Sequence, residues 1–304
     1  MFEVLSIENL NIVWLLHLVS WLLVTMADKY SAVWVSHSSI NDFLKCPRAY
    51  FLRSMYRNPR GMKINVVNPH LSLGIAVHET LEGLLNYKTA DRFSKPLLHT
   101  FEENWVKVSG KEGGFKTIEE ETEFKGRAQK MIERVDQHRG PLEQLAVKLT
   151  PHANNMPPNF YLSEEDNIIL NGKVDWLQYI PEDDSIKVID FKTGKNDEDP
   201  DSLQLPIYAL LLNALQKRKV SGAAYWYIDR NNDPTDVTLP DTKSAKDRVL
   251  AAAIKVKAAR ERGVFECPYG AKGCFACKSF EKIIRGEAQL VKVDESRKTE
   301  LYMT

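Results

Sequence analysis

Two aspartates and a lysine in the middle of the chain have the types and spacing of a metal-dependent hydrolytic site. Asp175 and Asp190 fall on two successive predicted strands joined by a tight turn, so their carboxylates are expected to converge. Two carboxylates held together repel each other unless a cation lies between them, and their hard oxygen atoms favour Mg²⁺ or Mn²⁺. Lys192 follows Asp190 by two residues, which places both side chains on one face of a strand. A lysine there can orient or deprotonate a water molecule that attacks a phosphate.

Each of these side chains alone is more simply explained as a solvated surface charge beside a turn. Asp190, however, follows Val188 and Ile189 in an apolar strand, where an unpaired carboxylate would cost on the order of several kcal/mol. Something must compensate that charge. The three residues together therefore favour a functional site.

The surrounding sequence predicts a single α/β domain. Three consecutive strands carry the two aspartates, and a helix separates them from two further strands. A serine that can cap a helix begins the first helical segment, and Pro47 is expected to break or bend it. The expected strands are 159–163, 167–180, 186–191, 222–228 and 237–239, and the expected helices are 36–56, 73–87, 202–217 and 243–262.

Charged, helix-favouring sequence between the second helix and the first strand predicts a helical insert over about residues 88–150. It contains few runs of β-branched residues. No internal repeat or long linker divides the sequence, so we expect one domain over residues 26–304.

Residues 1–25 differ in character from the rest of the chain. Ile12 to Thr25 form an apolar stretch of 14 residues, short of the roughly 20 residues that span a bilayer. No Lys or Arg precedes this stretch and no small-residue cleavage site follows it, so a secretory signal is not expected. We expect translation to start at Met26, which makes residues 1–25 an upstream extension. The alternative is a peripheral apolar segment that packs on the domain or on a membrane surface. For the protein as a whole, we expect no stable association with a membrane.

The composition of the 304 residues is that of an ordinary globular protein. Lys plus Arg (41) balance Asp plus Glu (41), so a nucleic-acid partner would bind in a local groove rather than through a global positive field. With 15 Gly and 14 Pro, the chain fits neither a low-complexity nor a fibrous class. Its four cysteines are too few for a disulfide-built secreted scaffold.

The spacing of these cysteines in the sequence is typical of metal or cluster ligands in a protein of a reducing compartment. Cys267, Cys274 and Cys277 crowd together, while Cys46 stands alone near the other end. Four thiolates hold either Zn²⁺ in a tetrahedral site or a 4Fe-4S cluster. A buried free thiol explains Cys46 alone, but it explains the other three poorly. A shared metal would tie two distant parts of the domain together.

The order of the motifs resembles that of the PD-(D/E)XK nuclease superfamily, and specifically its RecB-like branch. The matching motifs are Gly172-x-x-Asp175, Asp190-Phe191-Lys192 and Gln204-x-x-x-Tyr208. The resemblance covers about residues 36–285, with long unmatched helical sequence between His78 and Gly172. It implies a restriction-endonuclease-like core, in which helices flank a central mixed β-sheet. It also implies a C-terminal cysteine clasp, in which Cys46 joins the cysteines of residues 267–277.

The resemblance implies a role for each residue of these motifs. Lys192 would orient water or stabilise the transition state, while Gln204 and Tyr208, four residues apart on one helix face, would position the lysine and DNA. On its own, His78 would more simply be an ordinary helix histidine, but the other motifs favour it as a ligand. The implied ligands of Mg²⁺ or Mn²⁺ are His78, Asp175, Asp190 and the backbone carbonyl of Phe191.

The cysteines extend the resemblance. Some helicase-nuclease subunits and CRISPR-associated nucleases of the RecB-like branch clasp a 4Fe-4S cluster with one N-terminal and three C-terminal cysteines. This chain is similar to them, including the proline after Cys46, but the longer gap Cys267-x6-Cys274 precedes the close pair Cys274-x2-Cys277. The resemblance implies a 4Fe-4S cluster, with Zn²⁺ as the alternative.

The function that the resemblance implies is a metal-dependent DNA exonuclease acting on single-stranded DNA or DNA ends in recombination, repair or replication. A CRISPR-adaptation nuclease uses the same motifs. A non-catalytic iron-sulfur DNA-binding module is a further alternative, although every catalytic position is occupied. With the main interpretation we expect a helicase or recombination partner. We also expect a cytoplasmic location in a bacterium or a phage-infected host.

Two further groups of residues are candidates for contacts with nucleic acid, each with a simpler structural explanation. Basic side chains near Cys46 can track a phosphate backbone or form a solvated helix face. Aromatic side chains on a late strand can stack on bases or lie in the core. The basic group is Arg48, Arg53 and Arg57, and the aromatic group is Tyr225, Trp226 and Tyr227.

Overall fold

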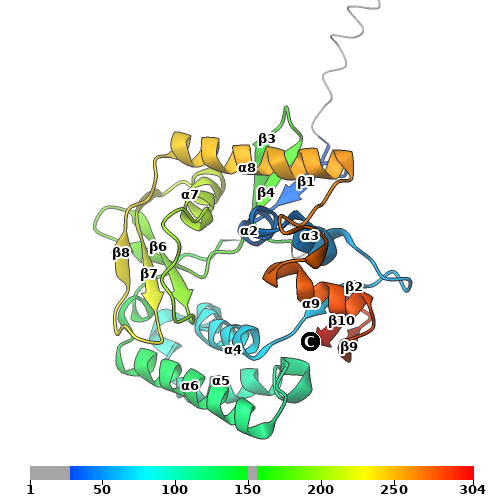
Figure 1. Ribbon diagram of the computed structural model, residues 1–304. Coiled ribbons are helices and arrows are strands. Elements are labelled where there is room, and N and C mark those ends of the chain that lie inside the picture. Colours follow the sequence, from blue (N-terminus) through cyan, green and yellow to red (C-terminus); the bar gives the residue numbers. More distant parts are fainter. Residues whose placement is uncertain (1–27, 150–155) are drawn as a thin grey trace, which may run out of the picture.

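The computed structural model describes residues 28–149 and 156–304, so the extension expected for residues 1–25 lies outside the described residues. In these ranges the chain forms three β-sheets with helices packed around them (Figure 1). No helix in the described part of the chain is both long and apolar enough to cross a bilayer. The helices are α2 (His37–Lys45), α3 (Pro47–Tyr50), α4 (Pro69–Gly83), α5 (Leu97–Val106), α6 (Ile118–Gln137), α7 (Gln204–Leu215), α8 (Thr242–Arg262) and α9 (Phe275–Ile284).

The central sheet is mixed, which confirms the predicted fold class. Its strands, in spatial order, are β5 (Trp176–Ile180), β6 (Ser185–Lys192), β7 (Lys219–Tyr227) and β8 (Thr235–Val237). β6 is antiparallel to β5 and parallel to β7, and β7 is antiparallel to β8. Helix α7 connects β6 with β7, because parallel neighbours need a crossover connection.

Successive residues of β6 point to opposite faces of the sheet, and each face has its own hydrophobic core. Ile186 and Val188 belong to the core that α7 and α8 cover. Ile189 and Phe191 belong to the core that α4, α5 and α6 cover, seen below the sheet in Figure 1. Asp190 therefore lies on the α7 face of a strand that is buried on both sides.

The prediction of one strand over residues 167–180 is wrong. These residues form β4 (Ile168–Asn171) and β5, which lie in different sheets, and Asp175 occupies the bend just before β5 rather than a strand. The chain crosses between the sheets at Gly172, where a Cβ would lie 2.7 Å from Leu211 Cδ1. The crossing thus runs close against α7, and the missing side chain makes room for it.

Two smaller sheets complete the described fold. In the second, β4 pairs with β1 (Val33–Val35) and with β3 (Asn159–Ser163). In the third, β10 (Thr299–Met303) pairs with β2 (Lys63–Val66) and with β9 (Gln289–Asp294). The sequence analysis does not predict the third sheet, because the pairing of β2 with β10 joins distant parts of the chain and leaves no local pattern.

Helices α2 and α3 meet at Cys46, which ends α2 and caps the N-terminus of α3. Pro47 is the first residue of α3, where its missing N-H is tolerated, so the predicted break is confirmed. A π-helical segment, Phe51–Met55, continues α3. Helix α9 lies beside α3 (Figure 1), although the two are far apart in the sequence.

The segment predicted as a helical insert contains α5 and α6, which pack against α4. Arg127 on α6 fastens this layer to the end of β6. Its guanidinium donates hydrogen bonds to the Thr193 carbonyl at 2.9 Å and to Asp229 Oδ2 at 3.0 Å. The insert therefore helps to fix the chain that follows the strand.

Candidate active site

Helix α4 carries the first two side chains of the site. Asn68 caps the helix by accepting a hydrogen bond from the Leu71 amide at 3.0 Å, and Pro69 occupies the first helical turn. His78 and Glu82 are four residues apart and share one face of the helix. His78 Nδ1 lies 3.3 Å from Glu82 Oε1.

The end of β6 lies close to this helix. A Cβ at Gly74 would be 3.4 Å from Thr193 Oγ1, which is van der Waals contact. The approach brings the ring of His78 to 6.0 Å from that of Phe191, centroid to centroid. His78 Nδ1 is 3.5 Å from Asp175 Oδ2, and the same oxygen accepts a hydrogen bond from the Phe191 amide at 2.9 Å.

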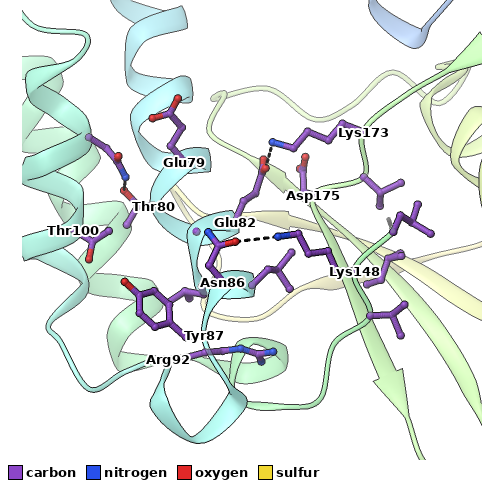
Figure 2. A pocket seen from close by; sticks show the side chains of 18 of the residues that line it. Glu79, Thr80, Glu82, Asn86, Tyr87, Arg92, Thr100, Lys148, Lys173 and Asp175 are labelled. Atoms are coloured by element: carbon purple, nitrogen blue, oxygen red, sulfur yellow. Dashed lines mark hydrogen bonds and ion pairs between the residues drawn. The ribbon is translucent and has the colours of Figure 1, made fainter. Parts of the chain in front are cut away.

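The structure thus assembles three side chains that can hold a metal ion. One ligand atom from each of His78, Glu82 and Asp175 lies within 4.8 Å of the others. Figure 2 shows Glu82 on α4 facing Asp175 across the site. The sequence analysis missed Glu82, and its signal is the spacing of four residues from His78 on one helix face.

The two carboxylates give this group a negative potential. Burial by itself would lower the pKa of His78, but hydrogen bonds and charges from Asp175 and Glu82 outweigh burial and raise the pKa to about 10. Burial opposes ionisation of Asp175, yet the neighbouring His78 holds the pKa of that carboxyl below its ordinary value. Without a metal ion, the imidazolium is therefore the local counter-charge, a role that a divalent cation can take over.

Asp190 is held mainly by α7. Its Oδ1 accepts hydrogen bonds from Gln204 Nε2 at 2.8 Å and from Tyr208 OH at 2.9 Å. Burial, followed by the charge of Asp175, raises the pKa of Asp190 to about 7. Its Oδ2 is buried and has no hydrogen-bond partner among the described residues, but it lies 2.9 Å from the ammonium of Lys192.

Lys192 lies between two carboxylates, which agrees with its predicted position on the same face as Asp190. Its Nζ is 2.9 Å from Asp190 Oδ2 and 2.7 Å from Glu198 Oε2, and it also donates a hydrogen bond to Gln204 Oε1. Burial alone would lower the pKa of Lys192, but Asp190 and Glu198 raise it. The ammonium therefore stays protonated. The sequence analysis missed Glu198 because it lies in a charged loop without periodicity.

The donors at the end of β6 fit a hard divalent cation. An imidazole nitrogen and carboxylate oxygens are ligands for Mg²⁺ or Mn²⁺. Against the effect of burial, Asp175 and Glu82 raise the pKa of His78, and burial raises that of Asp190, so a bound cation would displace a proton from each. Asp190 lies outside the group of three, and its role as a ligand, like that of the Phe191 carbonyl, stays a prediction.

A cleft of about 780 Å³ opens beside the metal-ligand group (Figure 2). Lys173 reaches across it to form an ion pair with Glu82. Farther along, Lys148 Nζ donates a hydrogen bond to Asn86 Oδ1 at 2.9 Å. The cleft thus places two ammonium groups near the metal-ligand group, and this arrangement suits an anionic substrate.

The four cysteines converge between α3 and α9. Cys277 Sγ lies 3.8 Å from the sulfur atoms of both Cys267 and Cys274. The amides of Ala49 and Cys274 donate to the sulfur atoms of Cys46 and Cys277, at 3.4 Å and 3.1 Å, and thereby oppose the burial that raises the pKa of both thiols. The donors therefore fit a thiolate-bound metal. All ligand sulfur atoms lie within 4.8 Å of one another, and they belong to Cys46, Cys267, Cys274 and Cys277.

Separations of 3.8 Å match the edge of a tetrahedron around a single ion bound at about 2.3 Å. A four-iron cluster, in which each thiolate binds a different iron, would need the sulfur atoms farther apart. Rotation of the cysteine side chains can supply that spread.

The other candidate nucleic-acid contacts are engaged within the fold. Of the two explanations for the late-strand aromatic residues, the structure supports the core, because all three are buried. Those residues are Tyr225, Trp226 and Tyr227. Arg48 pairs with Glu281, Arg53 pairs with Asp42, and Arg57 binds carbonyl groups of its own turn.

Comparison with models of known protein families gives a match. A family model described as the PD-(D/E)XK nuclease superfamily matches residues 34–279, which is more than half of the chain. The match contains every residue of the site above. No curated protein matches the chain.

We expect Glu82→Gln to weaken Mn²⁺ binding by about tenfold or more, because it removes one charged oxygen ligand. Calorimetric titration measures the dissociation constant. Glu79→Gln is the matched control, since Glu79 lies on the same helix but pairs with the exposed Lys107. Equal affinities for the two variants would exclude Glu82 as a ligand.

Metal binding is expected to release protons in a pH-dependent number. At pH 6 both His78, with a pKa of about 10, and Asp190, with a pKa of about 7, carry protons that an ion displaces, so about two are released. At pH 8.5 Asp190 is already ionised and about one proton is released. The apparent affinity therefore rises with pH, most steeply below pH 7. Titrations in buffers of different ionisation enthalpy count the protons, and a constant number between these pH values would contradict the assignment.

Proposed function

The chain belongs to the PD-(D/E)XK nuclease superfamily, and on that premise we propose that it is a Mg²⁺- or Mn²⁺-dependent exonuclease of single-stranded DNA or DNA ends. Membership implies a metal-dependent nuclease. The observation that carries the proposal is the metal-ligand group at one end of an open cleft, with the protonated Lys192 near enough for its charge to lower the pKa of Asp175. Hydrolysis of a phosphodiester needs these parts together.

The residues divide the work according to their charge. A divalent ion held by His78, Glu82 and Asp175 would polarise the phosphate and lower the pKa of a bound water. Lys192 stays protonated, so it acts as a hydrogen-bond donor that orients water or stabilises charge on the phosphate rather than as a base. Gln204 positions the lysine, since it bonds both Lys192 and Asp190.

The size of the cleft supports a single strand as the substrate. A volume of about 780 Å³ falls in the range of pockets for small ligands, so it suits a few nucleotides rather than a duplex. Lys148 and Lys173 supply positive charge along it. Action from an end, and roles in recombination, repair or replication with a helicase or recombination partner, rest on the RecB-like resemblance.

Two alternatives use the same chain. A CRISPR-adaptation nuclease would need the same metal-ligand group and lysine. A non-catalytic iron-sulfur DNA-binding module would need only the cysteine clasp, and the ordered hydrogen bonds around Asp190 and Lys192 favour the catalytic reading.

For the cysteine clasp we propose a 4Fe-4S cluster, with Zn²⁺ as the alternative. Either group would join the start of α3 to α9. Thiolate ligands also suit the reducing cytoplasm of a bacterium or of a phage-infected host as the place of action.

We expect Lys192→Ala to slow cleavage by about 10²- to 10³-fold while DNA binding is kept, because the substitution removes a charged hydrogen-bond donor that orients water or stabilises the transition state. The assay follows end-labelled linear single-stranded DNA with and without Mg²⁺, beside a circular single strand. Lys187→Ala is the matched control, because Lys187 lies on the same strand and pairs with Asp236.

Shortening of the linear strand with the circle left intact is the expected result for the unmodified chain. Cutting of the circle would show an endonuclease. Binding without cutting of either substrate would favour the non-catalytic module.

Cys277→Ser is expected to abolish metal binding at the clasp and to lower thermal stability, because Cys277 is buried at the centre of the sulfur set. Anaerobically purified protein should contain four irons and show a broad absorbance band at about 400 nm. Colourless protein that contains one zinc would show that the four cysteines hold zinc instead of the cluster. Protein without any metal would contradict the assignment of the cysteines as ligands. Ser279→Ala, two residues away, serves as the control.

A further inference from the structure

We propose that the cysteine-held loop and the exposed face of α9 form a second contact surface for single-stranded nucleic acid, on which Phe275 and Tyr269 stack on bases. The surface lies outside the metal-ligand group and the cleft. It rests on the proposed function, since it binds the same class of substrate.

Phe275 is almost completely exposed, at 99% of its surface, and Tyr269 is 73% exposed. Every other phenylalanine in residues 28–149 and 156–304 is buried or half-buried. A ring that buries no area adds nothing to folding stability, because hydrophobic stabilisation scales with the area removed from water. Two largely exposed rings a few residues apart therefore indicate a binding surface.

Both rings sit on backbone that the cysteines hold in place. Tyr269 follows Cys267 by two residues, and Phe275 follows Cys274 directly. Between them Gly273 has φ +67°, and a Cβ there would lie 3.1 Å from Cys277 Sγ, so the loop packs tightly on the sulfur set. A backbone held in this way loses little conformational freedom when a ligand binds.

The charge on this face complements a phosphate backbone. Phe275, Lys278 and Lys282 are spaced by three and four residues, so they form one stripe along α9, and both lysines are exposed. Neither has a carboxylate within ion-pair distance among the described residues. Glu281, the acidic residue between them, is buried and pairs with Arg48 instead.

A helix connects this surface to the active site. Cys46 is at the end of α2, and His37 at its beginning lies 3.4 Å, Nε2 to Oγ, from Ser202. Ser202 belongs to the loop that carries Glu198, the partner of Lys192. Nine residues of helix span about 14 Å, so a short helix joins the cysteine set to the loop that carries Glu198.

Exposed rings beside unpaired lysines fit unpaired bases rather than a duplex, because only an unpaired base offers its face for stacking. An apolar protein partner would use the rings but not require their aromatic character. That difference separates the two occupants in the test.

The test measures binding of a fluorescent oligodeoxythymidylate by anisotropy, without divalent ions so that nothing is cleaved. Tyr269→Ala with Phe275→Ala should weaken binding by about fivefold or more for each ring, with blunt duplex affinity unchanged. Phe275→Leu, which keeps apolar area but removes the ring, should weaken binding as Phe275→Ala does. Tyr30→Ala is the matched control, since Tyr30 is 88% exposed and has the Lys29 ammonium 5.3 Å from its ring centroid.

Unchanged affinity of the double variant, or an equal loss in Tyr30→Ala, would overturn the proposal. Full binding by Phe275→Leu would also overturn it and would indicate a protein partner. Metal content and melting temperature of each variant show whether the clasp is intact, and Phe275→Trp, which keeps a ring, should retain binding. Cleavage is assayed separately on a dinucleotide too short to reach the loop, so failure of the nuclease proposal and failure of this one give different results.

Discussion

A carboxylate buried at the end of a strand is the constraint around which this site is built. Asp190 is 2% exposed and follows residues that are buried on both faces of the sheet. A charge in that position is tolerated only with hydrogen bonds and counter-charges around it. Helix α7 supplies two donors from one face, and the strand itself supplies Lys192. Glu198 then balances the lysine, so each added charge requires the next.

The parts of the site that the sequence predicts are those that follow a fixed period. Asp190 and Lys192 share a face because a strand repeats every two residues, and Gln204 and Tyr208 share one because they lie four apart on a helix. The mixed sheet follows from the same patterns. Glu198 follows no period, since its position depends on how a loop folds back over the strand. The passage of the chain from one sheet to another at Gly172 is also not predicted, because the apolar residues on both sides of it fit the pattern of one continuous strand.

The chain keeps hard and soft metal donors apart. Carboxylates and an imidazole gather at the end of β6, whereas thiols gather between α3 and α9. Oxygen donors suit Mg²⁺ or Mn²⁺ and thiolates suit iron or zinc, so each set selects its own kind of metal by chemistry. Helix α2 runs from Cys46 of the cysteine set to His37, which contacts Ser202 in the loop that carries Glu198.

The pairing of the third sheet has a consequence for biosynthesis. Asn58, just before β2, binds Glu300 on β10, which lies 242 positions farther along the chain. All residues of the metal-ligand group leave the ribosome well before β9 and β10 do, and before the three C-terminal cysteines. The nascent chain therefore carries the residues of its metal-ligand group while the edge of β2 is still unpaired and Cys46 still lacks the other three cysteines. Closing the fold is a late, non-local step, of the kind that is slow and exposes intermediates to aggregation.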